Sequence, residues 1–187
     1  MSSLDTTPSP TGHTPEGGVL VGSDDARRKL VVFEDPQCPY CRQFEDASGD
    51  LLRREVSSGS VSVEYRMRSF LGPESVRANN ALALAAEAGR FDQLRAALFA
   101  DQPPEGSGGF TADDLVRIGQ RVGLDGDYAD GVREERYVDW VLATEERFGE
   151  EDPDGTPMLY VDGRRLEPRS VYDPQTLRET LAEALRG

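Results

Sequence analysis

The chain has 187 residues, which is enough for one domain with a substantial hydrophobic core and short for two. Charged residues make up 30% of the chain and the formal net charge is −14, which argues against the clustered positive charge that nucleic-acid binding needs. No apolar run reaches the roughly 18 residues that a membrane-spanning helix needs.

The first 18 residues are rich in Thr, Ser, Pro and Gly, and they predict a disordered tail at 1–18 without the apolar core of a signal peptide. His13, the only histidine, lies in this segment. We assign it no metal-binding or general-base role, because a tail offers no fixed partners. The expected location is cytoplasmic for the sequence as written, or extracytoplasmic if a signal or anchor was removed.

A strand, a helix and a second strand are predicted next. Val19–Val21 is expected to form a short edge strand, and the apolar residues of Lys29–Phe33 predict a strand that is buried on both faces. Pro39 suits the first turn of a helix that we expect to run to about residue 56, with a possible kink at Ser48-Gly49. Alternation over 61–65 predicts the second strand, with a right-handed crossover if the two strands are parallel.

Residues 74–148 are expected to be helical, interrupted by a Pro- and Gly-rich loop at 103–109. Thr111 and the acidic residues after it resemble a helix start. The aromatic residues around Trp140 are most simply core residues of another amphipathic helix.

The end of the chain predicts a hairpin and a helix. Met158–Val161 is expected to be a strand, and Asp162-Gly163 is a strong signal for a hairpin turn. Asp173-Pro174 predicts the start of the last helix. Its inner face would carry three leucines spaced four apart: Leu177, Leu181 and Leu185.

The only two cysteines, Cys38 and Cys41, stand where the first buried strand gives way to a helix. A lone C-x-x-C at such a junction is typical of a redox dithiol. The open helix N-terminus would favour the Cys38 thiolate, and Cys41 would face the same side one turn later, so the spacing permits a disulfide. An inert structural pair is the alternative, and a zinc site would need further ligands.

Three features together resemble the thioredoxin fold in its DsbA-like branch with a CPYC active site. They are the run 33–41, the run 155–163 and the helical block between them, and the resemblance covers about residues 19–187. It implies an α/β fold whose β-α-β and β-β-α halves are separated by an inserted helical domain. The implied division is a tail at 1–18, an N-terminal half at 19–72, a helical insert at 73–150 and a C-terminal half at 151–187.

The resemblance also implies the site residues. Cys38 would be the nucleophile and Cys41 the resolving thiol. Substrate binding and support of the active site would come from Pro39, Tyr40, Thr156 and the cis-proline Pro157. The Cys38–Cys41 disulfide would be the redox-active center, and neither another cofactor nor a metal is expected. The expected partners are cysteine-containing proteins or peptides and a redox recycling partner, without nucleic acid and without a membrane span in this chain.

One position departs from the pattern of the family. Thioredoxin-like proteins usually carry a buried acid six residues before the first cysteine, and here that residue is Val32. Glu34 and Asp35 are nearer to the cysteines, but strand alternation does not assign either of them to a place behind the sulfurs. Glu34 or a water molecule is therefore the expected proton acceptor for Cys41.

The charges near the dithiol predict moderate oxidising power. Glu34 and Asp35 oppose a thiolate and Arg42 favours it, and these charges would be screened if they are exposed. We expect the pKa of Cys38 in the upper part of the range of about 3.5 to 7 known for this fold. Arg42, Arg53 and Arg54 are expected to form a solvated helix face.

The sequence thus predicts a protein-disulfide oxidoreductase or isomerase that forms a mixed disulfide through Cys38. A glutathione-dependent reductase or isomerase on the same fold is one alternative. A non-catalytic peptide-binding or chaperone module on this scaffold is the other.

Overall fold

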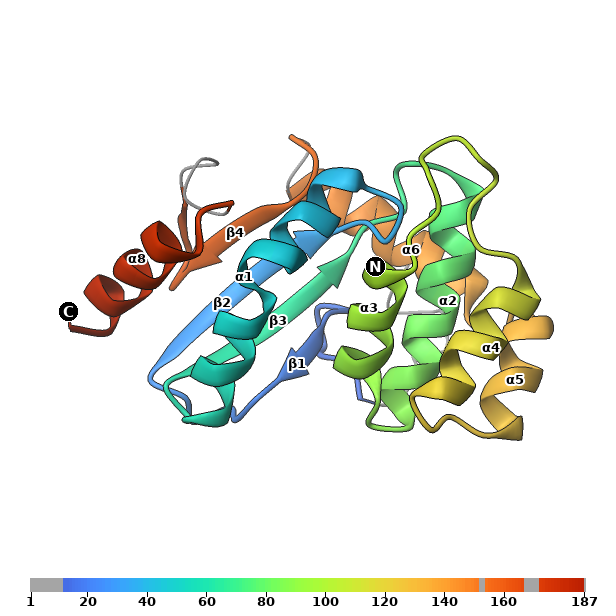
Figure 1. Cartoon of the computed structure of the whole chain (residues 1–187), viewed down its shortest axis with the longest axis horizontal. Helices are drawn as coiled ribbons and strands as arrows, with labels where there is room; N and C mark the ends of the chain where they lie inside the picture. Colours follow the sequence, from blue (N-terminus) through green and yellow to red (C-terminus); the bar gives the residue numbers. More distant parts are fainter. Residues whose placement is uncertain (1–11, 152–153, 167–171, 187) are drawn as a thin grey trace.

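The structure of the protein is a computed structural model that describes residues 12–151, 154–166 and 172–186. Its elements alternate between strands and helices, with a block of helices in the middle (Figure 1). In chain order they are β1 (Val19–Val21), β2 (Arg28–Glu34), α1 (Pro39–Ser57), β3 (Val61–Met67), α2 (Pro73–Glu87), α3 (Phe91–Ala100), α4 (Ala112–Arg121), α5 (Gly126–Arg133), α6 (Val138–Glu151), β4 (Met158–Val161), β5 (Arg164–Arg165) and α8 (Pro174–Arg186).

The described strands form one mixed sheet in the order β1-β3-β2-β4-β5. β2 and β3 are parallel and are joined through α1, which is the predicted crossover. β1 pairs antiparallel with β3 at one edge, and β4 pairs antiparallel with β2. The predicted turn at Asp162-Gly163 joins β4 to the antiparallel β5.

Both faces of the sheet are covered, which explains why residues 30–33 of β2 are all apolar. Leu30 and Val32 face α1 and pack in the main core with Phe44 and Leu52. The alternate residue Phe33 faces the other side, where it packs against Phe148 of α6 and Met158 of β4. Figure 1 shows α1 and α8 on the same face of the sheet.

The five helices α2 to α6 follow β3 and precede β4, as the helical block predicted over 74–148. Their centre is the Ala-rich α2, which packs against α3, α4, α5 and α6. Small alanine side chains let neighbouring helices approach closely, so Ala78, Ala81 and Ala85 are fully buried. At the predicted start of α4, the Thr111 side chain accepts from the Asp114 N–H and the Asp114 carboxylate accepts from the Thr111 N–H. The proposed domain limits at 72/73 and 150/151 stay predictions.

The prediction of a disordered tail at 1–18 is wrong for residues 12–18, and residues 1–11 lie outside the described part. His13 forms an isolated bridge with Val19, and its ring meets the Trp140 ring edge-on with centroids 4.4 Å apart. The Thr14 hydroxyl donates a 2.9 Å hydrogen bond to Glu64 on β3. Composition alone does not reveal this order, because Trp140 and Glu64, which His13 and Thr14 contact, lie far along the chain.

The last helix begins where Asp173 accepts hydrogen bonds from the Gln175 N–H and the Thr176 hydroxyl. Leu177 is fully buried in the main core. The side chains of Leu181 and Leu185 lie outside the described residues.

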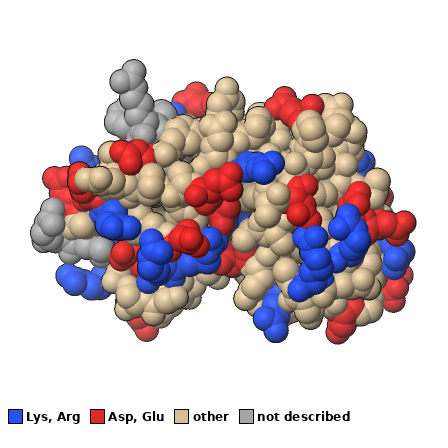
Figure 2. Space-filling view, in the orientation of Figure 1, with Lys and Arg blue, Asp and Glu red and all other residues tan. Residues whose placement is uncertain are grey.

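The surface carries mixed charge. On the face that Figure 2 shows, Lys and Arg side chains lie among Asp and Glu side chains rather than in one basic stripe. In the described part of the chain, helices long and apolar enough to cross a membrane are absent.

Candidate active site

The two cysteines lie at the N-terminus of α1, where the chain leaves β2 (Figure 1). Cys38 is the N-cap residue, with extended backbone at φ −75° and ψ 120°, and Pro39 occupies the first turn, where its missing N–H costs nothing. The Cys38 carbonyl accepts hydrogen bonds from the N–H groups of Cys41 and Arg42. Both cysteines are free thiols in this structure.

The two sulfurs differ in basicity. Cys38 is 5% exposed, and its pKa is lowered to about 6, chiefly because the Cys41 thiol donates a hydrogen bond to its sulfur. The N–H groups of Tyr40 and Cys41 lower the pKa further, whereas burial raises it. Cys41 is fully buried, and burial is the main cause that raises its pKa well above the usual value. Near pH 7 Cys38 is therefore the thiolate and Cys41 the proton donor.

The value for Cys38 lies in the upper part of the range expected from the sequence. The reason differs in part from the expected one. Glu34 and Asp35 were expected to be screened if exposed, but both side chains are fully buried. Arg42 instead forms an exposed pair with Asp46 on the helix surface, as expected for a solvated face.

The walls around the sulfurs come from three parts of the chain. Cys38 and Cys41 pack against Phe99 of α3, with the half-buried Leu71 beside them. Across the site, the Thr156–Pro157 peptide bond is cis, and the Thr156 carbonyl lies 3.5 Å from the Cys38 sulfur, where it accepts a hydrogen bond when Cys38 is protonated.

Of the residues predicted from the sequence, the structure brings Cys38, Cys41 and Thr156 together. Tyr40 instead points to solvent and is 58% exposed, so it is available at the rim of the site rather than inside it. Pro39 serves the helix start.

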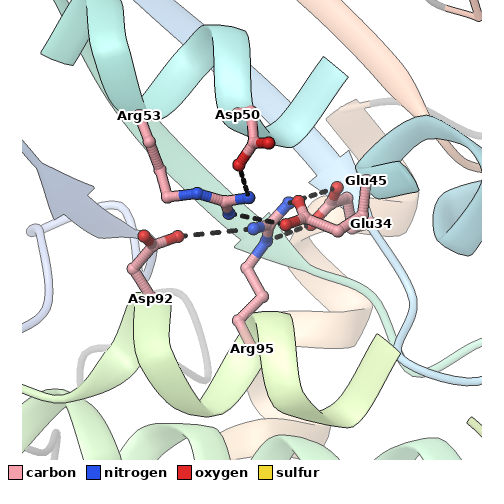
Figure 3. A network of polar contacts seen from close by, with 6 residues as sticks. All are labelled: Glu34, Glu45, Asp50, Arg53, Asp92 and Arg95. Carbon is pink, nitrogen blue, oxygen red and sulfur yellow. Dashed lines mark hydrogen bonds and ion pairs between the residues drawn. The ribbon is translucent and has the colours of Figure 1, made fainter. Parts of the chain in front are cut away.

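Glu34 belongs to a buried ionic network with Arg95 and Glu45 (Figure 3). The Arg95 guanidinium, from α3, donates to both oxygens of Glu34 at 2.7 and 3.0 Å and to Glu45 at 2.8 Å. It also stacks over the Tyr65 ring, 4.2 Å from the centroid. Within the network, it is the charge of Glu34 that acts on the Cys41 thiol.

The outer end of the network reaches the surface through Arg53. Its guanidinium donates to Glu45 at 2.6 Å and to Asp50 at 2.9 Å (Figure 3). The expectation that Arg53 belongs to a solvated face is therefore wrong in part, because half of its fork is used on a buried carboxylate. Asp92 of α3 adds a longer contact to Arg95, at 3.4 Å.

Strand alternation places Glu34 on the same face as Leu30 and Val32, the face that α1 covers. The expectation that strand alternation leaves Glu34 unassigned is therefore wrong, because residues two apart in a strand face the same side. Glu34 thus lies on the same side of the sheet as Val32 and is two residues nearer to the cysteines along the chain. Burial raises the pKa of Glu34, against the opposing effect of Arg95.

Two further residues support the loop between β2 and α1, and the sequence pattern did not mark them as site residues. Gln102, just after α3, donates from Nε2 to the carbonyls of Pro36 at 2.8 Å and Cys38 at 3.1 Å. Asp35 turns away from Glu34 and accepts hydrogen bonds from Gln37, Leu71 and Ser75. Both contacts tie the loop to the helical block.

The arrangement can perform thiol–disulfide exchange, because it combines a thiolate stabilised at a helix end, a second buried thiol and a buried acid whose charge acts on that thiol. It does not resemble a metal centre, because the described residues contain no group of three His, Cys, Asp or Glu side chains placed to hold an ion.

Solved structures share this fold over nearly the whole chain. MdbA, a thiol-disulfide oxidoreductase from Actinomyces oris, has a TM-score of 0.81 at 16% identity and covers 98% of this chain and 96% of its own. BdbD from Bacillus subtilis has a TM-score of 0.81 at 20% identity, covering 96% and 98%. DsbA from Mycobacterium tuberculosis has a TM-score of 0.78 at 24% identity, covering 91% and 93%.

A curated protein also matches in sequence. Over 154 residues the chain is 29% identical to part of the Na⁺/H⁺ antiporter NhaA 3 of Salinispora tropica. The match covers 81% of this chain, and the chain spans 22% of the length of that protein.

The family model described as thioredoxin matches residues 14–181, which include both cysteines and the Thr156–Pro157 bond. The chain therefore belongs to the thioredoxin family, with the DsbA-like α/β arrangement of a helical block inserted between β3 and β4.

Proposed function

We propose that the protein is a protein thiol-disulfide oxidoreductase that uses the Cys38–Cys41 pair. The observation that carries the proposal is the asymmetry of the two thiols: Cys38 has a pKa of about 6 at the helix end, whereas Cys41 is fully buried with a raised pKa. Proteins named as thiol-disulfide oxidoreductases share the fold, which supports the proposal.

In the oxidising direction, a substrate thiolate attacks the Cys38 sulfur of the disulfide. The Cys38–Cys41 bond breaks, a mixed disulfide forms at Cys38, and Cys41 leaves with the electron pair and takes up a proton. The second substrate thiolate then attacks the substrate sulfur, which releases Cys38 as its stabilised thiolate. Two electrons pass from the substrate dithiol to the protein, and the reverse sequence reduces or isomerises a substrate disulfide.

Glu34 is the proposed partner for the proton of Cys41. It is fully buried, its pKa is raised by burial, and its charge acts on the Cys41 thiol. A carboxyl group that is easily protonated can give a proton when Cys41 leaves and accept one when Cys41 attacks.

The proposed substrate contacts lie on the Thr156 and Tyr40 sides of Cys38. An extended substrate segment would pair with the backbone at Thr156 in the manner of an added strand. Pro157 fixes that backbone beside the sulfur, and the exposed Tyr40 offers an aromatic surface at the rim. The proposed partners are cysteine-containing proteins or peptides and a redox protein that recycles the pair.

The compartment determines the direction of exchange. In a reducing cytoplasm the pair would act as a reductase, and in an oxidising extracytoplasmic space as an oxidase or isomerase. The disulfide is its own redox centre, and we propose no further cofactor.

Insulin reduction with a small dithiol as reductant tests the proposal. We expect wild-type protein to accelerate precipitation of the insulin chains, and the Cys38→Ser variant to be inactive. A strict requirement for glutathione would instead favour a glutathione-dependent reductase. Inactivity of a folded wild-type protein in both reduction and oxidation assays would contradict the proposal and favour a non-catalytic peptide-binding module.

A further inference from the structure

Asp35 is a buried carboxylate that the exchange reaction does not use. It lies three residues before Cys38, its side chain is fully buried, and it accepts three hydrogen bonds. Oδ1 accepts from the Ser75 hydroxyl at 2.6 Å and from the Gln37 N–H at 2.9 Å, and Oδ2 accepts from the Leu71 N–H at 3.2 Å. These neutral donors hold the carboxylate in place.

Its environment contrasts with that of its neighbour in sequence. Glu34 is paired in a bidentate contact with Arg95, whereas the donors that Asp35 receives in the structure are a hydroxyl and two N–H groups. Burial is the main cause that raises the pKa of Asp35, and the Cys38 thiolate, which has the same sign, adds to the rise. Burial of a charge without a cation is costly. We therefore expect the Asp35 carboxylate to do more than hold the loop in place.

The neighbouring elements β3 and α2 also carry charged side chains. From β3, Arg68 forms an ion pair with Glu145. From α2, Arg77 donates to the carbonyls of Gly108 and Phe110, and Glu74 lies half-buried beside Gly109.

We propose that Asp35 is a positioning residue whose buried negative charge opposes the Cys38 thiolate and so holds the dithiol at moderate oxidising power. The inference rests on the proposed oxidoreductase function. The three hydrogen bonds fix the loop, and the charge sets the basicity of the nucleophile.

Electrostatic repulsion between the two groups has a reciprocal effect. Burial, with a contribution from Cys38, raises the pKa of Asp35 from 3.8 to about 6, the value near which Cys38 also titrates. Each group therefore ionises less readily when the other is charged, and the pair titrates in a coupled way. Removing the charge at Asp35 should favour the Cys38 thiolate, which in this fold accompanies stronger oxidising power.

A role in positioning the loop and a role of the charge predict opposite changes in the pKa of Cys38, so a substitution can tell them apart. The Asp35→Asn variant keeps the size and an acceptor oxygen but removes the charge. If the charge matters, the pKa of Cys38 falls. If Asp35 only holds the loop, weaker contacts should move Cys38 away from the helix N–H groups and its pKa rises toward the ordinary value.

The experiment measures the rate of Cys38 alkylation by iodoacetamide against pH in the reduced full-length protein, with fold checked by circular dichroism. For Asp35→Asn we expect the midpoint to fall by about half a unit or more, which is a roughly three-fold larger thiolate fraction at acidic pH. The equilibrium with glutathione should also shift toward reduced protein, because a more stable Cys38 thiolate stabilises the reduced form. Gln102→Leu is the matched control, since it loosens the same loop without touching Asp35.

A midpoint for Asp35→Asn that is unchanged, or raised together with that of Gln102→Leu, would overturn the inference. Ser75→Ala is the second variant, and it decides the matter if Asp35→Asn does not fold. Without the Ser75 hydroxyl the Asp35 carboxylate keeps its proton to higher pH, so the Cys38 midpoint should again fall, and a rise would overturn the inference. Insulin reduction by wild-type protein is measured in parallel, because its absence would reject the proposed function and not the effect of Asp35 on Cys38.

Discussion

The environment of a single residue in this site depends on which side of the backbone its side chain occupies. Glu34 and Asp35 are adjacent, yet Glu34 faces Arg95 under α1 while Asp35 faces Ser75 and Leu71. Both are fully buried, and burial raises the pKa of each. They differ in their partners, because the Arg95 cation pairs with Glu34, whereas Asp35 accepts hydrogen bonds from a hydroxyl and two N–H groups.

Removal of that cation should be costly. Arg95→Met would leave Glu34 and Glu45 without their shared partner in the interior, and we expect the free energy of unfolding to fall by about 3–5 kcal/mol. Urea unfolding measures the loss. Arg117→Met is the control, since Arg117 and Asp114 form an exposed pair whose loss should cost ~0–1 kcal/mol. Equal losses for the two variants would contradict the role of the network.

The lowered pKa of Cys38 also predicts a pH-dependent stability. The folded-state pKa of about 6 lies below that of an unfolded cysteine, so the stabilisation is complete above the unfolded pKa and is lost as pH falls through about 6. The oxidised protein has no Cys38 thiol and lacks this contribution. We expect the reduced form to gain stability relative to the oxidised form as pH rises from about 6 to about 8.5. Denaturant midpoints of both forms that run parallel across this range would show the expectation to be wrong.

Among the elements, α1 combines two tasks: it presents Cys38 at its end and carries Glu45 in its interior. The sequence predicted a possible kink at Ser48-Gly49, but the helix is continuous from Pro39 to Ser57. Gly49 has a different function, because a Cβ atom there would clash with the Glu45 carboxylate. The missing side chain leaves room for the carboxylate that binds Arg95.

Gly49→Ala should therefore reverse the usual effect of alanine in a helix. Alanine is normally favoured over glycine by roughly 1 kcal/mol, but here the methyl group displaces Glu45 and we expect a net loss of about 1–3 kcal/mol. Gly126, at the start of α5, is the matched control, since a Cβ there meets no atom within 4 Å. Urea unfolding of both variants compares them, and a stabilised Gly49→Ala protein would refute this explanation.

Across the whole molecule, the parts that the sequence could predict are those encoded locally. Strand alternation, the Pro39 helix start and the C-x-x-C spacing act over a few residues, and the strands and helices follow them. Arg95 is 61 residues from Glu34, and Gln102 is 64 residues from Cys38. No local period marks such contacts, because they form only when the helical block packs against the sheet.

The helical block thus does more than cover the site, because α3 and its end contribute three groups to it. Arg95 binds Glu34, Phe99 packs with the two cysteines, and Gln102 donates a hydrogen bond to the Cys38 carbonyl. A two-half thioredoxin core alone would lack all three. The roles of Thr156, Pro157 and Tyr40 toward substrate stay predictions.

Trapping of the mixed disulfide tests the central claim most directly. A reduced, unfolded substrate protein is mixed with Cys41→Ser and Cys38→Ser variants that carry an activated disulfide on their remaining cysteine, and the adducts are located by peptide mass spectrometry. The account predicts a stable adduct through Cys38 in the Cys41→Ser variant and little or none through the buried Cys41 in the other. Equal adducts at both cysteines, or an adduct at Cys41 alone, would contradict it.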